Sequence, residues 1–470
     1  MVRARPAWLT DRCSALILDP MELAALILAA GKGTRMKSAL PKVLHPIAGR
    51  SMVGHVLDTV SGLDPTQVAV VIGPDMDVVA DAVAPAAAVV QPEQLGTADA
   101  VKAAREVLPG GDGTVLVLYG DTPFIGRETL EKMVAARQAS SDTAVVVLGF
   151  RPPDPGAYGR LVLGADGALE AIVEARDATP EQLDIDLCNS GVMAIDRARL
   201  WSLIDAVGND NAKGEYYLTD IIAIARGQGL GCAYIEAGAE ELSGVNSRAE
   251  LAVAEAIMQQ RLRAEVMANG ATLTDPTTVW FSHDTKIGQD VSIGPNVFFG
   301  PGVSVANGAE IRAFCHLEGA QVGEGVTLGP FARLRPGAVV QKGARVGNFV
   351  EVKNATLEEG AKVNHLTYIG DARVGKAANV GAGTITCNYD GFLKYHTDIG
   401  AGAFIGSNTA LVAPVKIGDG AIVGAGSTIG RDVEADALAV ERAEAKTTPG
   451  WAKMFREKKS AEKAAKAKKK

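Results

Sequence analysis

The sequence predicts an α/β protein in which a mainly parallel, Rossmann-like domain is followed by a linker helix and a left-handed parallel β-helix. In the first half, short apolar runs alternate with helical patterns, which is typical of a parallel sheet covered by helices. In the second half, an apolar residue recurs every six positions, the period of a β-helix built from hexapeptide repeats. A chain of 470 residues also exceeds one ordinary hydrophobic core, so more than one domain is expected.

The first domain is expected from residues 22 to 247, with strands and helices in alternation. The buried strands are Leu23–Ala29, Gln67–Ile72, Thr114–Leu118 and Ala144–Leu148, and a helical pattern spans Glu128–Gln138. In such a sheet, substrates bind at the carboxyl ends of the strands.

The linker and the ends of the chain follow from composition. Residues 248–268 are rich in Ala, Glu, Leu and Met without Gly or Pro, which predicts one long helix. Residues 1–21 show no clear pattern and are either a disordered extension or an artefact of the start site. The Lys-rich tail, 447–470, is expected to be a solvated, frayed helix, with binding of coenzyme or of an acidic partner as the alternative.

The second domain, 269–446, is predicted from the hexapeptide period. The apolar positions are Ile287, Ile293, Phe299, Val305, Ile311 and Leu317; Val322, Leu328, Leu334, Val340, Val346 and Val352; Leu357, Val363 and Ile369; Val374 and Val380; and Ile399, Ile405, Leu411, Ile417, Val423 and Ile429. Gly residues after these positions suit tight corners. The register is lost over 386–398, which predicts an expelled loop that lines a site, or else a tolerated surface insertion.

Composition and charge exclude several classes of function. The net charge of -8 argues against a general nucleic-acid binder. Five scattered cysteines without a C-x-x-C pair indicate neither a disulfide framework nor a zinc site, and they fit a reducing compartment. No apolar run approaches the ~20 residues of a membrane span. We therefore expect a cytoplasmic protein without a membrane or nucleic-acid partner.

A glycine-rich loop follows the first strand. The segment AAGKGTRM places Gly31, Gly33 and Arg35 at the carboxyl end of the sheet, where backbone N–H groups can approach a phosphate. The spacing is neither G-x-x-x-x-G-K-[ST] nor G-x-G-x-x-G, because Met36 stands where the third Gly would be. Asp121, in YGDTP, also follows a strand, where a carboxylate could hold Mg²⁺ beside phosphates.

The loop and the LPKVLHPIAGRSM segment after it together resemble the sugar-1-phosphate nucleotidyltransferase family. The resemblance implies that the loop holds a nucleotide triphosphate, that Arg35 and Lys42 act in catalysis by neutralising its charge, and that Asp121 and Asn246 bind Mg²⁺. It implies attack by the phosphate of N-acetylglucosamine 1-phosphate on the α-phosphorus of UTP, with pyrophosphate leaving.

Further matches, in QPEQLGTADA, YGR, IVEARDAT and CNSGV, resemble the uracil-reading and N-acetylglucosamine segments of that family. The implied UTP and UDP-N-acetylglucosamine contacts are Leu28, Ala29, Ala30, Gly31, Gly33, Lys42, Gln91, Gln94, Gly96, Thr97, Gly159, Glu174, Asn189 and Asn246.

In the second half, ARLRPG, NFVEVKN, VNHLTYIGDA and NVGAGTITCNYDG resemble, in order, the acetyltransferase half of the bifunctional uridylyltransferase/glucosamine-1-phosphate acetyltransferase family. His365 is the expected general base, because histidine can take a proton near neutral pH. The implied glucosamine-phosphate contacts are Arg335, Lys353, Tyr368, Asn379 and Lys394, and the implied acetyl-CoA contacts are Ala382, Asn388, Tyr389, Ser407, Ala425 and Arg442. The resemblance also implies a homotrimer.

The resemblance runs from Glu22 to about Trp451. It implies an enzyme that acetylates glucosamine 1-phosphate and then forms UDP-N-acetylglucosamine, feeding peptidoglycan and lipopolysaccharide synthesis and so cell shape. One alternative is a monofunctional sugar-1-phosphate nucleotidyltransferase with a structural β-helix, which would lack His365, Lys394 and the Asn388–Tyr389 pair. Another is a non-enzymatic regulatory subunit, which would be expected to have lost Arg35, Lys42 or Asp121.

Overall fold

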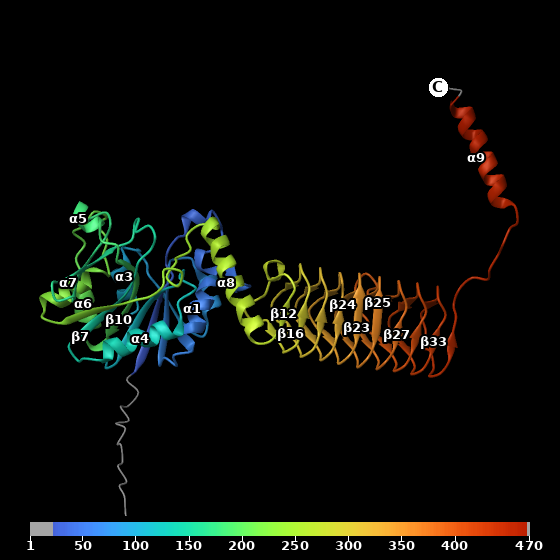
Figure 1. Cartoon of the computed structure of the whole chain (residues 1–470), viewed down its shortest axis with the longest axis horizontal. Helices are drawn as coiled ribbons and strands as arrows, with labels where there is room; N and C mark the ends of the chain where they lie inside the picture. The colour runs from blue at the N-terminus through green and yellow to red at the C-terminus, as the bar shows by residue number, and fades with distance from the viewer. Residues whose placement is uncertain (1–21, 468–470) are drawn as a thin grey trace, which may run out of the picture. The chain divides into compact units, whose positions relative to one another are not determined.

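The computed structural model describes residues 22–467 (Figure 1). The expectations for residues 1–21 and for the last three residues of the tail lie outside this range. The chain divides into two compact units, one ending at Met258 and the other beginning at Gln259. We call their described parts the α/β unit, 22–258, and the β-helix unit, 259–467.

The α/β unit contains a mixed sheet in the order β11-β7-β10-β6-β1-β4-β5. Its strands are β1 (Leu23–Leu28), β4 (Gln67–Ile72), β5 (Ala87–Val90), β6 (Thr114–Tyr119), β7 (Thr143–Phe150), β10 (Cys188–Asp196) and β11 (Gly231–Glu236), with a hairpin of β8 (Arg160–Leu163) and β9 (Leu169–Val173) beside β10 and a separate pair β2 (Pro46–Ile47) and β3 (Arg50–Ser51). Strands β5, β4, β1 and β6 are parallel, whereas β10 is antiparallel to both of its neighbours. The mainly parallel sheet predicted from the sequence is thus confirmed.

Helices cover both faces of this sheet. They are α1 (Met52–Ser61), α2 (Asp77–Val83), α3 (Thr97–Ala103), α4 (Arg127–Gln138), α5 (Pro180–Leu183), α6 (Arg197–Asp205) and α7 (Asp220–Gly227), with single 3-10 turns η1 (Thr34–Met36) and η2 (Lys42–Leu44). Alternate residues of β1 enter different cores: Leu26 packs with α3, α6 and α7, and Ile27 packs with α1, α2 and α4. A strand buried on both faces has no polar side, which explains its continuous apolar sequence.

The predicted strands differ from the observed ones only at their ends. The Gln67–Ile72 strand has the predicted bounds, while β1 ends one residue earlier and β6 and β7 are longer than expected. The linker helix α8 spans Arg248–Ala268, the range predicted from composition.

The β-helix unit stacks short parallel strands into coils (Figure 1). The strands are β12 (Thr272–Leu273), β13 (Lys286–Ile287), β14 (Ser292–Ile293), β15 (Phe298–Phe299), β16 (Ser304–Val305), β17 (Glu310–Ile311), β18 (His316–Leu317), β19 (Ala320–Val322), β20 (Thr327–Leu328), β21 (Arg333–Leu334), β22 (Ala338–Val340), β23 (Arg345–Asn348), β24 (Glu351–Leu357), β25 (Lys362–His365), β26 (Tyr368–Val374), β27 (Asn379–Val380), β28 (Ile385–Cys387), β29 (Thr397–Ile399), β30 (Phe404–Ile405), β31 (Ala410–Val412), β32 (Val415–Ile417), β33 (Ile422–Val423), β34 (Thr428–Ile429) and β35 (Leu438–Ala439), with η3 (Pro276–Thr278) near the start. Every apolar position of the predicted series lies in one continuous core, with Ile287 partly buried at its edge.

The predicted loop over 386–398 is wrong at both ends. Thr386 belongs to β28 and is buried in register with Leu411, and Thr397 and Asp398 belong to β29. The hydroxyl of Thr386 accepts a hydrogen bond from the Gly370 N–H at 2.8 Å, so a polar residue occupies the inward column without an unsatisfied group. A search for apolar residues alone misses this position. The excursion from the coil is shorter, residues 388–396.

The tail forms helix α9, Trp451–Ala467, in which every residue is exposed. Within residues 22–467, no helix combines the length and the apolar character that crossing a bilayer requires.

Candidate active sites

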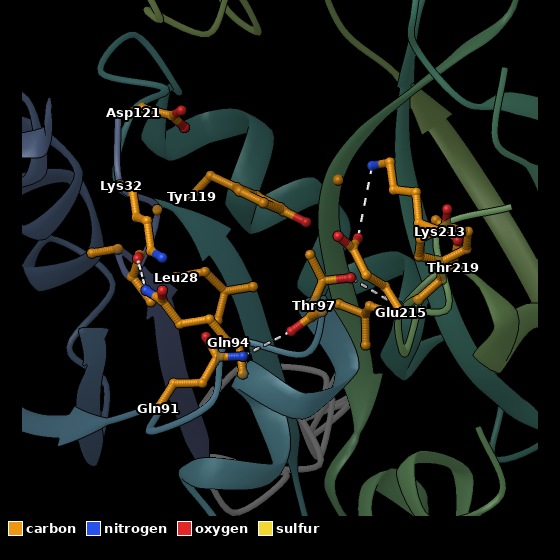
Figure 2. Close-up of a pocket in the computed structure, with 18 of the residues that line it drawn as sticks. Leu28, Lys32, Gln91, Gln94, Thr97, Tyr119, Asp121, Lys213, Glu215 and Thr219 are labelled. Atoms are coloured by element: carbon orange, nitrogen blue, oxygen red, sulfur yellow. Dashed lines mark hydrogen bonds and ion pairs between the residues drawn. The ribbon is translucent and has the colours of Figure 1, made fainter. Parts of the chain in front are cut away.

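The first site is a cavity of about 620 Å³ at the carboxyl ends of the parallel strands of the α/β unit (Figure 2). The sequence-predicted residues that line it are Leu28, Ala29, Ala30, Gly31, Lys42, Gln91, Gln94, Gly96, Thr97, Asp121, Glu174 and Asn189. Figure 2 shows Gln91 and Gln94 on one side of the cavity and Lys213 on the other. The structure thus brings together segments that are distant in the sequence.

The two glutamines of the QPEQLG segment are fixed by side-chain hydrogen bonds. The Gln94 amide N–H donates to the carbonyl of Ala30, which links this segment to the glycine-rich loop. The Gln91 amide N–H donates to Asp99 at 2.7 Å and to the Gly96 carbonyl at 3.0 Å. The arrangement holds both side chains at the wall of the cavity.

A segment that the sequence analysis missed closes the opposite wall. Tyr216 pairs with the loop before α3 and with the first turn of that helix, since its N–H donates to the Leu95 carbonyl at 2.8 Å and its carbonyl accepts from the Ala98 N–H at 2.9 Å. Gly96 permits this approach: its φ is +129°, and a Cβ there would lie 2.5 Å from the Tyr216 oxygen. The neighbouring residues that reach the cavity are Lys213, Glu215, Tyr217, Leu218 and Thr219. The cluster of charged and aromatic residues in KGEYYLTD was the only sequence signal for them.

Glu174 and Asn189 form a polar end of the cavity. The Asn189 N–H donates to the Gly159 carbonyl at 2.8 Å, and a Cβ at Gly159 would lie 3.5 Å from Glu174 Oε1. Burial raises the pKa of the Glu174 carboxyl, and the charge of Lys213 and a hydrogen bond from Thr219 oppose that rise. A carboxyl and an amide held side by side are suited to sugar hydroxyls.

Lys42 lies between the two residues predicted to bind metal. Its ammonium contacts Asp121 and donates to Asn246 Oδ1 at 3.0 Å. The Val245 N–H donates to the Asp121 carbonyl at 3.0 Å, which fixes Asn246 beside Asp121. Gly33 allows Lys42 to pack closely, because a Cβ there would lie 2.6 Å from Lys42 Cβ. A carboxylate and an amide oxygen that converge on one cation fit the donor set that Mg²⁺ takes from protein.

Arg35 is the one predicted catalytic residue of this unit that does not line the nucleotide cavity. It lines a neighbouring cavity of about 530 Å³ together with Tyr158, Asn246 and Glu250. Its side chain is exposed. Since Asn246 also contacts Lys42, the two cavities meet at the candidate metal site.

The second site lies on the β-helix unit and gathers cations. Arg335 pairs with Glu351 at 2.8 Å, and Lys353 pairs with Asp371 at 3.4 Å. The adjacent Lys353 lowers the pKa of Lys394, with Arg335 adding to the effect. These three cations outnumber the two carboxylates paired with them, Glu351 and Asp371, and the positive charge left over makes a site for an anionic group such as a phosphate.

Asp371 organises this group and was not predicted from the sequence. It accepts hydrogen bonds from Asn354 at 2.6 Å, from Asn388 and from Lys353, and these bonds hold its pKa below the usual value against the effect of burial. Its φ is +48°, a left-handed conformation that Asp tolerates better than most residues. The YIGDA motif contained it, but only the fold shows its partners.

The side chain of His365 makes its hydrogen bond with Asn348, and not with a residue of the cation group. Its Nδ1 lies 2.8 Å from Asn348 Oδ1, across a register pair of β23 and β25. Within residues 22–467 it has no hydrogen bond or ion pair with Arg335, Lys353 or Lys394, so the structure does not place the predicted base in contact with the predicted phosphate site. Asn379, a predicted sugar contact, lies on β27, which neighbours the strand of His365, β25, in the same sheet.

Three of the predicted acetyl-CoA residues, Ala382, Ser407 and Ala425, lie at turns of successive coils, whereas Asn388 and Tyr389 lie in the 388–396 loop and Arg442 follows β35. The Asn408 N–H donates to the Ala382 carbonyl at 2.7 Å, and the Gly426 N–H donates to the Ser407 carbonyl at 2.8 Å. The guanidinium of Arg442 donates to the Ala425 carbonyl at 2.8 Å. The 388–396 loop is closed by an antiparallel bridge between Tyr389 and Lys394. It carries Lys394 of the cation group, and its first residue, Asn388, donates to Asp371.

Comparison with known proteins agrees with the two units. Residues 25–183 match the MobA-like NTP transferase domain, and residues 284–319 and 396–431 match the bacterial transferase hexapeptide (six repeats). The bifunctional protein GlmU of Paramagnetospirillum magneticum is 64% identical over 95% of this chain and 99% of its own length. The GlmU protein of Rhodospirillum rubrum is 67% identical over 92% of this chain and 97% of its own length, and that of Rhizorhabdus wittichii is 58% identical over 94% and 98%.

Identity of this extent across both units excludes the monofunctional alternative and confirms the resemblance found in the sequence. The chain belongs to the GlmU family of bifunctional enzymes and is an N-acetylglucosamine-1-phosphate uridylyltransferase and a glucosamine-1-phosphate N-acetyltransferase of UDP-N-acetylglucosamine synthesis.

Proposed function

We propose that the α/β unit joins UTP to N-acetylglucosamine 1-phosphate with Mg²⁺ bound through Asp121 and Asn246, and that the β-helix unit acetylates glucosamine 1-phosphate from acetyl-CoA with His365 as the base. The observation that carries the first part is the convergence of Lys42, Asp121 and Asn246 at the nucleotide cavity. For the second part it is the cation group beside the 388–396 loop.

In the first reaction, the chain's own residues hold the reactants and neutralise charge. Gln91, Gln94 and the glycine-rich loop bind the nucleotide, and Glu174 and Asn189 orient the sugar. The sugar phosphate attacks the α-phosphorus, the bond to the β-phosphate oxygen breaks, and pyrophosphate leaves. Mg²⁺, when bound, supplies positive charge to the phosphates. Lys42 and Arg35 act on the charge that develops in the transition state.

In the second reaction, the glucosamine amine attacks the thioester carbonyl of acetyl-CoA. An ammonium group must lose a proton first, and His365 takes it through Nε2 when Nδ1–H donates to Asn348. The C–S bond breaks, the amide forms, and the CoA sulfur accepts a proton. Arg335, Lys353 and Lys394 hold the sugar phosphate with Tyr368 and Asn379. The acetyl-CoA contacts are Ala382, Asn388, Tyr389, Ser407, Ala425 and Arg442.

The same proposal includes a homotrimer that works in the cytoplasm, where UTP and acetyl-CoA are available. Hexapeptide repeats support a multimeric enzyme. Its product would supply peptidoglycan and lipopolysaccharide precursors and so cell-wall biogenesis.

The test is to incubate the protein with glucosamine 1-phosphate, acetyl-CoA, UTP and Mg²⁺ and to identify the products.

Asp121→Ala should abolish uridylyl transfer and leave acetylation near normal, because the sites lie on different units. His365→Ala should slow acetylation by ~10² to 10⁴ and leave uridylyl transfer intact. Loss of both activities in either folded variant would contradict separate sites.

A further inference from the structure

The ammonium of Lys42 occupies the point on which the candidate metal ligands converge. Asp121 is 79 residues away in the sequence and Asn246 is 204 residues away, yet both place an oxygen on the same Nζ atom. The side chains of Lys42 and Asp121 are only 13% and 17% exposed. Lys42 is therefore the cation that satisfies this partly buried carboxylate.

Mg²⁺ and this ammonium group cannot hold the same two oxygens together. Mg²⁺ binds oxygen at about 2.0 to 2.1 Å, so a metal on Asp121 and Asn246 would lie within the space that Nζ occupies. Two cations at such close range also repel strongly in a partly buried site. Metal binding therefore requires Lys42 to leave.

The displaced ammonium group needs a new anion. Burial of an unpaired charge is costly, and Lys42 already lines the nucleotide cavity. The phosphates of a bound nucleotide are the anions that this cavity would offer. Nucleotide binding draws Lys42 away from Asp121, and the vacated oxygens then accept the metal.

We infer that Lys42 is a resident counter-ion that exchanges with the divalent metal, so that the metal and the nucleotide triphosphate bind cooperatively. The inference rests on the proposed roles of Asp121 and Asn246 as metal ligands. It assigns Lys42 a second task besides catalysis: it keeps the metal site closed until a nucleotide arrives.

The experiment measures Mn²⁺ binding to the substrate-free full-length protein by electron paramagnetic resonance, with no turnover involved. Lys42→Met removes the competing cation at nearly constant side-chain length. The variant should bind Mn²⁺ about tenfold more tightly than the wild type, a change in affinity of the size that coupling between two binding events usually produces. Lys42→Arg keeps the charge and should bind as weakly as the wild type. Thermal melting checks that each variant is folded.

A matched control separates exchange from simple charge repulsion. Lys32 lines the same cavity but is exposed. Lys32→Met also removes one positive charge and should change the Mn²⁺ affinity by less than about twofold, as screening by solvent predicts. Equal gains in Lys32→Met and Lys42→Met, or no gain in Lys42→Met, would overturn the exchange.

A double variant distinguishes this failure from failure of the metal site itself. Lys42→Met with Asp121→Asn should lose the tight Mn²⁺ binding gained by Lys42→Met alone. If the double variant kept it, Asp121 would not be a metal ligand, and both the exchange and the proposed metal site would be wrong. If Lys42→Met gained nothing while Asp121→Asn alone weakened Mn²⁺ binding, the metal site would stand and only the exchange would fall.

Discussion

At the scale of single residues, two side chains that lie within the quoted motifs, but were given no role there, support residues for which a role was predicted. Asp371 holds Lys353, on the proposed sugar-phosphate side, and Asn388, on the proposed acetyl-CoA side. Asn348 holds the imidazole of His365. Both act through another residue, so we regard them as positioning residues.

Removal of the Asp371 charge should weaken binding of the sugar phosphate. Asp371→Asn keeps an acceptor for the amides but loses the charge that orients Lys353, so we expect KM for glucosamine 1-phosphate to rise about tenfold, as loss of a charge-assisted hydrogen bond would give. Steady-state kinetics of acetylation measures this. An unchanged KM together with a lower melting temperature would show that Asp371 serves only folding.

Asn348 should control the proton position on the imidazole of His365, the proposed base. Asn348→Leu removes the acceptor for Nδ1–H and should lower kcat of acetylation about 10²-fold while KM changes little, the usual order for loss of a positioned base. Asn348→Asp keeps an acceptor and should retain more activity, with its pH profile moved to higher pH because a carboxylate favours the protonated ring. Equal kcat values and profiles for wild type, Asn348→Leu and Asn348→Asp would remove Asn348 from the mechanism.

At the scale of elements, strands were predictable where apolar residues recur at a regular interval. They were missed where a polar residue takes the place of one of these apolar residues. The inward column of the β-helix continues through Thr386, which is buried because its hydroxyl bonds the backbone of Gly370. The wall made by 213–219 could not be predicted either, since it depends on backbone pairing with residues more than a hundred positions away. Local pattern predicts elements, whereas their partners depend on the folded chain.

Thr386→Val tests this account of the column. The variant keeps the shape of the side chain but leaves the buried Gly370 N–H without its acceptor, which should destabilise the protein by about 1 to 3 kcal/mol. Thr356→Val, at a half-exposed position of β24, should change the free energy of unfolding by less than about 0.5 kcal/mol. Urea unfolding compares the two variants, and equal stabilities would contradict a structural role for the Thr386 hydroxyl.

At the scale of the whole molecule, the sequence predicted two folded parts of different architecture, and each contains at least one buried cysteine. Cys232 lies in the α/β unit and Cys315 in the core of the β-helix unit. Burial raises the pKa of each thiol to about 11. Since the thiolate is the reactive form, both should resist alkylation in the native protein.

Alkylation by iodoacetamide at pH 8 should therefore report unfolding of each unit separately. We expect no labelling of Cys232 or Cys315 without denaturant, and labelling of each only when its own unit opens in urea. Mass spectrometry of the digested protein measures both sites in one sample. Rapid native labelling of either thiol would contradict its burial.

The coils of the β-helix repeat at a nearly constant interval, as the pairing of Lys286 with Ser304 and of Phe298 with His316 shows, each 18 residues apart. Duplication of one whole coil would therefore lengthen the domain without disturbing its neighbours. An insertion of any other length would shift the register of every later coil, unless it formed a loop whose two ends meet at the same corner of the coil. The 388–396 segment meets that condition, because the Tyr395 N–H donates to the Asn388 carbonyl at 2.9 Å and closes its base. Corners of this kind are where such a scaffold can acquire new chemistry during evolution at little cost to its architecture.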